Sequence, residues 1–366
     1  MSNSLLKPLK IGDLTAKIPV IQGGMGVGIS LSGLAGAVAA SGGIGVISTA
    51  QIGYRSENFY KDPLGCNLHA IKEEINKARK TAGSGIIGVN IMVATKRYEE
   101  YVKAAVAAGV DIIISGAGLP MTLPELVGKA KTKIAPIVSS LKSAQVILKY
   151  WGKKYDRLPD MVVIEGPLAG GHLGFKGEQL TQMEELNYDG EIRKIIEHVT
   201  EYAGEYGKEV PVVIAGGIYT REDAEHAFSL GASGVQVGTR FVTTYECDAS
   251  EAYKQAYIDA AKEDIIIVNS PVGMPARAIS NEFTRRAGEG RIPPERCSGC
   301  IITCNPAETP YCITQALIHA VKGNIKEGLL FCGANAYKAK KLEYVKDIME
   351  EFKIDEKKQD ILRMGD

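Results

Sequence analysis

The chain has 366 residues, 45% of them hydrophobic and 23% charged, which is the balance of a globular protein and excludes a disordered chain or a fibrous repeat. Its 43 basic and 43 acidic residues cancel to a net charge of zero. No global field would therefore draw the protein to nucleic acid or to an anionic membrane, and an anionic ligand would have to be held by local groups.

The amino terminus and the cysteines favour a reducing compartment. Residues 1–13 lack the apolar segment and the small-residue cleavage site of a signal peptide, and seven cysteines are an odd number for a secreted disulfide framework. We therefore expect a cytoplasmic protein. Residues 18–54 are uncharged over a length that exceeds a membrane span, but their ten glycines break the stretch into strand, turn, helix and strand. We predict a buried part of a sheet there and no membrane segment.

Short runs rich in β-branched residues alternate with helical stretches along most of the chain. Eight strands are predicted, at residues 18–22, 44–48, 86–90, 110–115, 134–139, 161–165, 211–215 and 234–238. Each is followed by a predicted helix, at residues 31–41, 68–82, 97–108, 123–131, 142–151, 191–206, 221–230 and 250–262. Eight strand-helix units that bury a wholly parallel sheet predict an α/β protein with a (β/α)8 TIM barrel.

An open doubly wound sheet is the alternative fold. Its nucleotide loop would be the glycine-rich segment 23–28, but the spacing is not G-x-G-x-x-G. In addition, no acidic residue lies between Gly28 and Glu57 to hold a ribose hydroxyl. The barrel is therefore the preferred prediction.

The pattern changes after the eighth helix, and this change defines the predicted domains. Residues 1–285 are expected to form the barrel, and residues 286–366, which contain a cysteine cluster and a helical tail, a C-terminal extension packed on it. The polar insert at 175–189, between the sixth strand and its helix, is long enough to form a lid.

Glycines follow two neighbouring strands at the rim where barrel active sites form. Residues 215–218 read Ala-Gly-Gly-Ile, and residues 237–240 read Val-Gly-Thr-Arg. Because glycine has no Cβ, the backbone amides of these turns can converge on one phosphate. We predict a phosphate site here, the alternative being that the glycines merely connect elements. Arg240 would either pair with the phosphate or form a salt bridge across the rim.

His172 is the most informative single residue. It follows Ala-Gly-Gly at 169–171 and precedes Gly174, on the loop after the sixth strand. Flanking glycines would let the imidazole approach a ligand closely, and a titratable ring suits proton transfer near neutral pH. The other histidines fall in helical segments. Because no second histidine or acid lies at metal-ligand spacing from His172, we assign it no metal.

An ordered set of short motifs identifies a family. They are Gln-Gly-Gly-Met at 22–25, Gly-Val-Asn at 88–90, Gly-Ala-Gly at 116–118, Glu165 with Ala-Gly-Gly-His at 169–172, Ala-Gly-Gly-Ile at 215–218, and Gln-Val-Gly-Thr-Arg-Phe at 236–241. Together they resemble the nitronate monooxygenase (2-nitropropane dioxygenase) family of FMN-dependent barrels. The resemblance spans residues 16–285, and the set is specific although each piece is weak alone.

This resemblance implies an FMN oxidoreductase, a flavoprotein with a nucleotide-binding site at the mouth of the barrel. The positions that match FMN-binding residues are Gln22, Gly23, Gly24, Met25, Asn90, Glu165, Gly170, Gly171, Gly216, Gly217, Gln236, Gly238 and Thr239, of which Gly216, Gly217, Gly238 and Thr239 would hold the phosphate. His172 matches the catalytic histidine. The implied reaction converts an alkyl nitronate, or a nitroalkane deprotonated by the histidine, to a carbonyl compound and nitrite.

The same motifs also resemble the flavin-dependent enoyl-acyl-carrier-protein reductase, which would use NAD(P)H. Glu165 favours this reading, since many nitronate enzymes have glutamine there, whereas the cysteine-bearing tail favours the nitronate enzymes. Two further alternatives are a non-catalytic flavin-binding protein and a barrel that binds another phosphorylated metabolite. The expected partner is a small-molecule substrate, and a homodimer is the expected assembly.

Four cysteines lie close together near the C-terminal end. Cys297, Cys300, Cys304 and Cys312 form C-x2-C-x3-C-x7-C, and four thiolates at such spacing can ligate zinc or an iron-sulfur cluster. The spacing matches no closed zinc pattern, however, and Cys312 stands where a buried thiol at the start of a helix is an equally good interpretation. Both interpretations stay open at this point.

Overall fold

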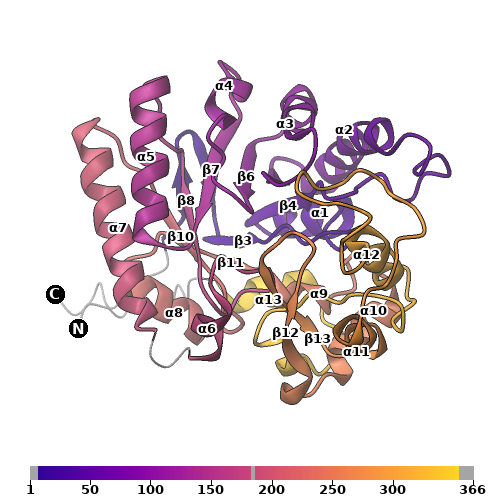
Figure 1. Ribbon diagram of the computed structural model, residues 1–366. Coiled ribbons are helices and arrows are strands. Elements are labelled where there is room, and N and C mark those ends of the chain that lie inside the picture. Colours follow the sequence, from indigo (N-terminus) through magenta and orange to yellow (C-terminus); the bar gives the residue numbers. More distant parts are fainter. Residues whose placement is uncertain (1–6, 183–185, 354–366) are drawn as a thin grey trace.

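A closed barrel of eight parallel strands is the centre of the computed structural model, which describes residues 7–182 and 186–353 (Figure 1). Its strands are β3 (Val20–Gln22), β4 (Ile44–Ser48), β5 (Ile86–Met92), β6 (Ile112–Gly116), β7 (Lys133–Val138), β8 (Val162–Glu165), β10 (Val212–Ala215) and β11 (Gly234–Val237). Neighbours in the chain pair in parallel, and β11 closes the ring on β3. The predicted TIM barrel is confirmed, with all eight strands at the expected segments.

Helices surround the barrel where the alternating pattern predicts them. They are α1 (Ser32–Ala40), α2 (Pro63–Ala82), α3 (Tyr98–Ala107), α4 (Leu123–Val127), α5 (Leu141–Tyr155), α7 (Tyr188–Glu205), α8 (Arg221–Ser229) and α10 (Glu251–Asp259). α2 begins earlier than predicted because Pro63 starts it and the Asp62 side chain accepts from Gly65 N at 2.9 Å. α4 is shorter than predicted because Gly128 ends it with φ of +56°.

The uncharged stretch 18–54 folds as part of this barrel. It contains β3, α1 and β4, the buried strand-helix-strand unit that the sequence predicts. Across residues 7–182 and 186–353, no helix combines the length and the apolar character that crossing a bilayer requires.

A short hairpin outside the prediction closes the amino-terminal end of the barrel. β1 (Leu9–Ile11) and β2 (Leu14–Ala16) pair antiparallel, and Leu9 and Ile11 belong to the same buried apolar cluster as Ile21 of β3 and Val213 of β10. The core inside the barrel is therefore sealed at the bottom, and the open end lies at the carboxyl ends of the strands.

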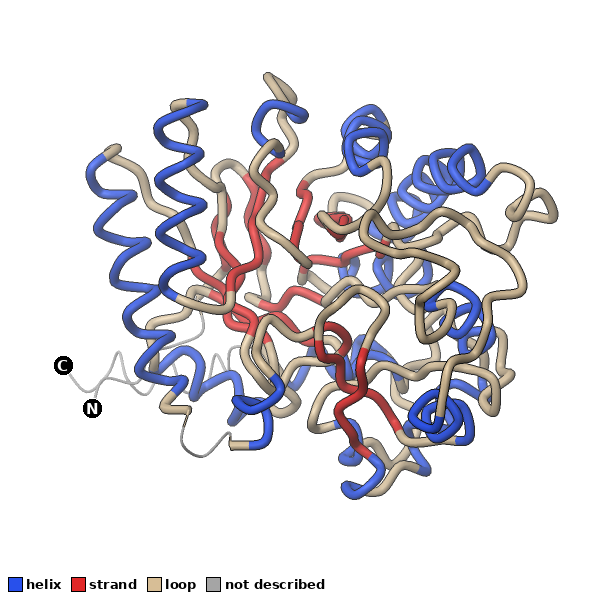
Figure 2. Tube along the Cα trace, viewed as in Figure 1, coloured by secondary structure: helices blue, strands red, loops and turns tan. Residues whose placement is uncertain are grey.

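The C-terminal part of the chain builds a second layer over the open end, visible as the separate three-stranded sheet in Figure 2. The sheet contains β9 (Gly171–His172), β12 (Ile265–Asn269) and β13 (Pro275–Ile279). The remaining elements are a short α6 (Gly177–Thr181), α9 (Thr239–Val242), α11 (Glu282–Glu289), α12 (Ile313–Val321), α13 (Val345–Glu351) and the 3-10 turns η2 (Lys262–Asp264) and η3 (Ala336–Lys338). One apolar cluster joins Ala278 and Phe283 to Ile301 and Leu329 and so crosses the predicted boundary at 285/286.

Arg240 ties this layer to the barrel. Its guanidinium donates to Glu343 at 3.0 and 3.1 Å and to Glu351 at 2.9 Å, and its side chain is only 9% exposed. The ring of Tyr219 lies 5.0 Å from it. Of the two roles considered for Arg240, the structure shows the salt bridge, because these carboxylates occupy the guanidinium away from the rim glycines.

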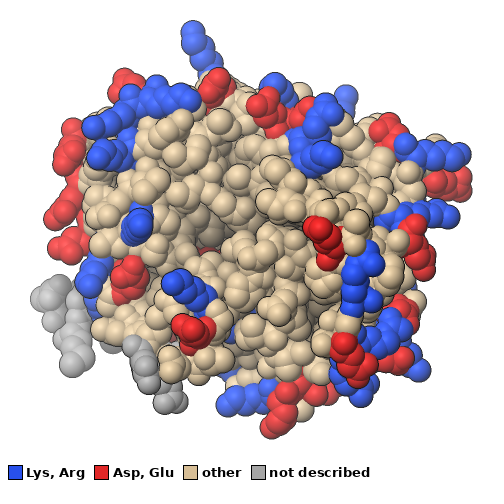
Figure 3. Space-filling model, viewed as in Figure 1, with Lys and Arg blue, Asp and Glu red and all other residues tan. Residues whose placement is uncertain are grey.

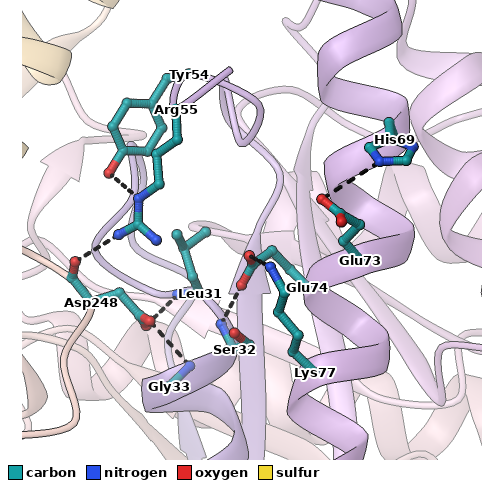
Figure 4. Close-up of polar contacts among 10 residues, drawn as sticks. All are labelled: Leu31, Ser32, Gly33, Tyr54, Arg55, His69, Glu73, Glu74, Lys77 and Asp248. Carbon is teal, nitrogen blue, oxygen red and sulfur yellow. Dashed lines mark hydrogen bonds and ion pairs between the residues drawn. The ribbon is translucent and has the colours of Figure 1, made fainter. Parts of the chain in front are cut away.

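The amino terminus of α1 is capped by residues that are distant in sequence (Figure 4). The Asp248 carboxylate accepts from Leu31 N at 2.8 Å, Gly33 N at 3.1 Å and Leu34 N at 3.1 Å. Glu74 of α2 accepts from Ser32 N at 3.0 Å. A helix leaves its first amides without intrahelical partners, so these two acids stabilise the element that directly follows the first glycine turn of the site.

Candidate active site

One large cavity opens at the carboxyl ends of the barrel strands. Its volume is about 440 Å³, within the range of small-molecule sites. Figure 3 shows that this face is hollowed near its middle and that charged side chains gather mainly around its edge. The predicted catalytic residue, His172, lines the cavity, and so do all of the predicted cofactor-binding residues except Gln22. These twelve are Gly23, Gly24, Met25, Asn90, Glu165, Gly170, Gly171, Gly216, Gly217, Gln236, Gly238 and Thr239.

Gln22 lies behind the cavity wall and positions the first glycine turn. It is fully buried, its amide group donates to Gly23 O and to Ser30 Oγ, and its Oε1 accepts from Val46 N at 3.1 Å. The residues that reach the cavity from this turn are Gly23, Gly24 and Met25. A side chain on Gly24 is excluded because its Cβ would lie 2.4 Å from Cβ of Asn90.

Two glycine turns after β10 and β11 form the adjoining part of the wall, because β11 pairs with β3. Gly216 and Gly217 both have φ of +91°, and a Cβ on Gly216 would lie 2.8 Å from the carbonyl oxygen of Gly166. Within the part of the chain that the structure describes, the backbone N–H groups of Gly216, Gly217 and Gly238 donate to no other residue. Free amides on converging glycine turns are the donor set that binds a phosphate.

The C-terminal layer completes this wall with residues that the sequence did not reveal. Gly333 N donates to Thr239 Oγ1 at 2.9 Å across 94 positions, and Asn335 Nδ2 donates to Gly217 O at 2.7 Å. Both residues line the cavity, as does Phe331. No local motif marks them, because they reach the rim through the fold of the extension.

His172 is fixed at the cavity wall by β9. It pairs with Ala276 of β13, its Nε2 lies 2.7 Å from Ser270 Oγ, and the Phe331 ring meets it edge to face at 5.1 Å. Burial lowers the pKa of His172 to about 4, since an enclosed site disfavours the charged ring. The imidazole is therefore neutral at physiological pH and able to accept a proton. Ser270 has no sequence signature and was not predicted.

Glu165 supplies a carboxyl group on the cavity wall. It ends β8, and it is half-buried because it faces the cavity. Burial raises its pKa to about 7, since no cation compensates the desolvation of the carboxylate. The cavity therefore joins a histidine held neutral and a carboxyl group that readily keeps its proton.

The cysteines do not assemble into a metal centre in this structure. Within residues 7–182 and 186–353, no group of three or more histidine, cysteine, aspartate or glutamate side chains is placed to hold a metal ion. Cys297 is exposed, whereas Cys300, Cys304 and Cys312 are half-buried. Cys300 and Cys304 pack in the apolar cluster of the extension, and Cys300 also lines the cavity.

The insert at 175–189 packs behind the histidine loop. Leu180 of α6 is buried against Ala169 and Leu173, and the Tyr188 hydroxyl donates to the backbone oxygens of Ser139 and Glu165 at 3.0 and 3.1 Å. Residues 183–185 of the insert lie outside the described residues. The described part borders a neighbouring hollow rather than the main cavity.

Comparison with known proteins gives relatives in both sequence and structure. The chain is 28% identical over 301 residues to a protein named "Probable nitronate monooxygenase" from Staphylococcus saprophyticus, a match that covers 76% of this chain and 80% of the relative. FabK from Thermotoga maritima superposes with a TM-score of 0.70 at 25% identity, over 95% of this chain and 96% of FabK. A nitroalkane oxidase from Streptomyces ansochromogenes shares the fold with a TM-score of 0.67 at 20% identity, over 92% of this chain and 94% of that one.

The family assignment follows from a match along nearly the whole chain. The family model for nitronate monooxygenase covers residues 7–355, which includes the barrel, the two glycine turns, the histidine loop and most of the C-terminal layer. Members of this family are flavoproteins. The chain belongs to the nitronate monooxygenase family, and it is an oxidoreductase of that type.

Proposed function

We propose that the protein uses FMN to oxidise alkyl nitronates or small nitroalkanes to a carbonyl compound and nitrite, with His172 as the base. The observation that carries this proposal is that a neutral imidazole and two glycine turns with free backbone amides face one cavity of about 440 Å³. A phosphorylated cofactor held by the turns would thus share the cavity with a proton acceptor.

The residues present fit FMN. The free amides of Gly216, Gly217 and Gly238 and the hydroxyl of Thr239 would hold the phosphate. Glycines at 23, 24, 170 and 171 would let the flavin ring approach the backbone closely, and Gly170 has no room for a side chain, since its Cβ would lie 2.6 Å from Gly333 N. Met25, Asn90, Glu165 and Gln236 supply the side chains beside the ring. When bound, FMN would accept electrons from the substrate and pass them on to oxygen.

His172 would act on a nitroalkane by removing a proton from the carbon that bears the nitro group. The C–H bond breaks, its electron pair stays on the carbon and nitro group as the nitronate, and the proton moves to the imidazole. Because Nε2 is occupied by Ser270, Nδ1 is the ring nitrogen available to accept it, and the tautomer required has its hydrogen on Nε2 and donates to Ser270 Oγ. A nitronate substrate would need no such step.

The part of the cavity wall that comes from the C-terminal layer is suited to an apolar substrate. Ile301, Ile313 and Leu317 from the extension and Met274 from the β12–β13 connection line it, and these side chains would exclude water from the reacting carbon. The extension therefore does more than cover the barrel, because it provides the surface against which an alkyl group would pack.

The proposed function is tested by nitrite release and oxygen uptake with propionate-3-nitronate and nitroethane. We expect both substrates to yield nitrite, and we expect His172→Ala to lose at least about a hundredfold of its activity toward nitroethane, the usual contribution of a positioned base. Activity toward the preformed nitronate should fall less. Absence of nitrite from both substrates with the flavin-loaded protein would refute the proposal.

Reduction of an enoyl thioester by NAD(P)H is the second candidate function. Glu165, where many nitronate enzymes have glutamine, and the likeness to FabK over 95% of the chain favour it. In that reaction the same cavity would hold an enoyl group against its apolar wall. Rapid NADH or NADPH oxidation that depends on crotonyl thioester, without nitrite release from nitro compounds, would support this candidate over the first.

A further inference from the structure

We propose that Glu165 binds the flavin cofactor as an uncharged carboxylic acid, so that cofactor binding above neutral pH takes up one proton from solution. The inference rests on the proposed function, because it requires FMN in the cavity. It assigns to Glu165 a proton-dependent recognition role that is separate from the base chemistry of His172.

The position of Glu165 isolates its carboxyl group from compensating charge. Its backbone lies at the end of β8, paired with Ala215 of β10, and its backbone oxygen accepts from Tyr188. Its side chain faces the cavity, and within the described residues its carboxylate oxygens form no ion pair and receive no hydrogen bond from a side chain or backbone group. A carboxylate so placed lacks both kinds of partner that stabilise its negative charge.

Nearby ionisable groups supply no positive charge to compensate the Glu165 carboxylate. On the cavity wall these are His172 of β9, Tyr257 of α10, and Cys300 and Cys332 of the extension. Tyr188 of α7 contacts the backbone of Glu165, and Glu191 of the same helix lies near Tyr188. None of them is a cation at neutral pH, because His172 is held neutral. Arg277 of β13 contacts this loop, but it is buried, donates to Ala169 O and does not line the cavity.

A bound flavin would strengthen the preference for the neutral acid. The cofactor would displace water from the cavity, and its phosphate would bring further negative charge into a pocket whose described wall contains no lysine or arginine. A carboxylic acid can donate its O–H to a carbonyl oxygen or ring nitrogen of the ligand, whereas a carboxylate can only accept. Glutamine at this position would present an N–H donor in the same place, which makes Glu165→Gln a close mimic of the protonated state.

The pH range for the effect follows from the groups involved. Burial raises the pKa of Glu165 to about 7, so the free protein loses this proton between pH 6 and 8. The pKa of His172 lies near 4, and burial raises the pKa values of Tyr188, Tyr257, Cys300 and Cys332 above their ordinary values of 9 to 10. Between pH 6 and 8 Glu165 is therefore the group on this wall whose charge changes.

The test is titration of the flavin-free protein with FMN at pH 6, 7 and 8, followed by quenching of flavin fluorescence. We expect the Kd of the native protein, divided by that of Glu165→Gln at the same pH, to rise about tenfold from pH 6 to pH 8, since each pH unit above the pKa removes a factor of ten of the protonated form. The ratio cancels the titration of the FMN phosphate. Glu225→Gln is the matched control, because Glu225 is exposed and paired with Arg221, and its ratio to the native protein should stay constant.

Calorimetry of the native protein alone provides a second measurement that needs no variant. Binding heats at pH 8 in two buffers of different ionisation enthalpy give the number of protons taken up, beyond the uptake by the phosphate, and we expect close to one. A constant Kd ratio between pH 6 and 8, or no proton uptake, would overturn the inference while leaving FMN binding intact. Failure of the native protein to bind FMN at any pH would instead overturn the proposed function on which it rests.

Discussion

Ser270 and His172 are 98 positions apart in the sequence, yet Ser270 Oγ lies 2.7 Å from Nε2 of His172. Ser270 follows β12, and His172 belongs to β9, which joins the same three-stranded sheet through β13. The backbone N–H of Val272 also reaches Ser270 Oγ, at 3.3 Å. The sheet thus fixes the ring orientation of His172, the proposed base, and leaves Nδ1 as the nitrogen without this contact.

Removing this hydroxyl should slow proton abstraction without weakening substrate binding. We expect Ser270→Ala to lower kcat for nitroethane about tenfold, the effect of losing one hydrogen bond of about 1.4 kcal/mol, with KM changed less than twofold. Ser270→Thr should restore most of the rate because it retains the oxygen. Ser229→Ala, which removes an exposed hydroxyl on α8, is the control. If the role of Ser270 were purely structural, the substitutions would instead raise KM, or the alanine and threonine variants would lose kcat equally.

The low pKa of His172 predicts an unusually acid-tolerant base. The neutral ring accepts the proton, and the depressed pKa means that this form persists as the pH falls until the pH approaches about 4. We expect kcat/KM for nitroethane to stay flat from pH 7 down to pH 5.5 and to fall below pH 5. Circular dichroism at each pH should verify that the fold is intact. A decline centred near pH 6.5 would show a histidine with an ordinary pKa instead.

The glycine turn after β10 should not tolerate a side chain, and a substitution there should weaken cofactor binding. We expect Gly217→Ala to weaken FMN binding at least tenfold, because the added Cβ would lie 2.9 Å from Leu168 Cδ1 and the backbone φ is +91°. Gly207→Ala is the control that separates an effect on FMN binding from the general cost of alanine at a positive φ. Gly207 also has a positive φ, +61°, but an added Cβ would meet nothing within 4 Å, so this variant should lose some stability and keep its FMN affinity. Equal affinities in both variants would argue against a phosphate site at residue 217.

The acidic cap on α1 should contribute measurably to stability. Asp248→Ala removes the acceptor of three backbone amides, and we expect the free energy of unfolding to fall by about 2 kcal/mol or more in urea denaturation. The free energy of unfolding of Asp248→Asn should fall less, since one side-chain oxygen remains to accept a hydrogen bond. Glu73→Ala is the control on the neighbouring helix (Figure 4), because its ion pair with His69 is exposed and 3.7 Å long. If Asp248→Ala unfolds at the same urea concentration as Glu73→Ala, the cap does not contribute to stability.

Much of the fold and part of the site could be predicted from local pattern. A strand of a buried parallel sheet has to be a continuous apolar run, and β4 and β6 are buried along their whole length. The glycines at 216, 217 and 171 could be predicted as turns because a backbone φ near +90° or +70° favours glycine strongly. His172 could be singled out because it stands within such glycines, at the end of a strand.

Other features left no local signal. The hairpin of β1 and β2 has strands of three residues each, too short for an alternating pattern, and residues 265–279 did not suggest a sheet. Gln22 matched a flavin-contacting position, but its side chain turns inward to hydrogen-bond β4. The direction of that side chain depends on the neighbouring strand, which the motif does not specify.

By itself the sequence determined the eight-unit barrel, the family and the glycine turns at the rim, because hydrophobic periodicity and backbone conformation are properties of neighbouring residues. Tertiary structure alone decided that Ser270 lies against His172, that Arg240 bonds to Glu343 and Glu351 rather than to a ligand, and that Gly333 and Asn335 contact the rim at Thr239 and Gly217. These contacts join residues roughly 100 positions apart, and the burial that shifts the pKa values of Glu165 and His172 likewise arises only when distant parts of the chain pack together.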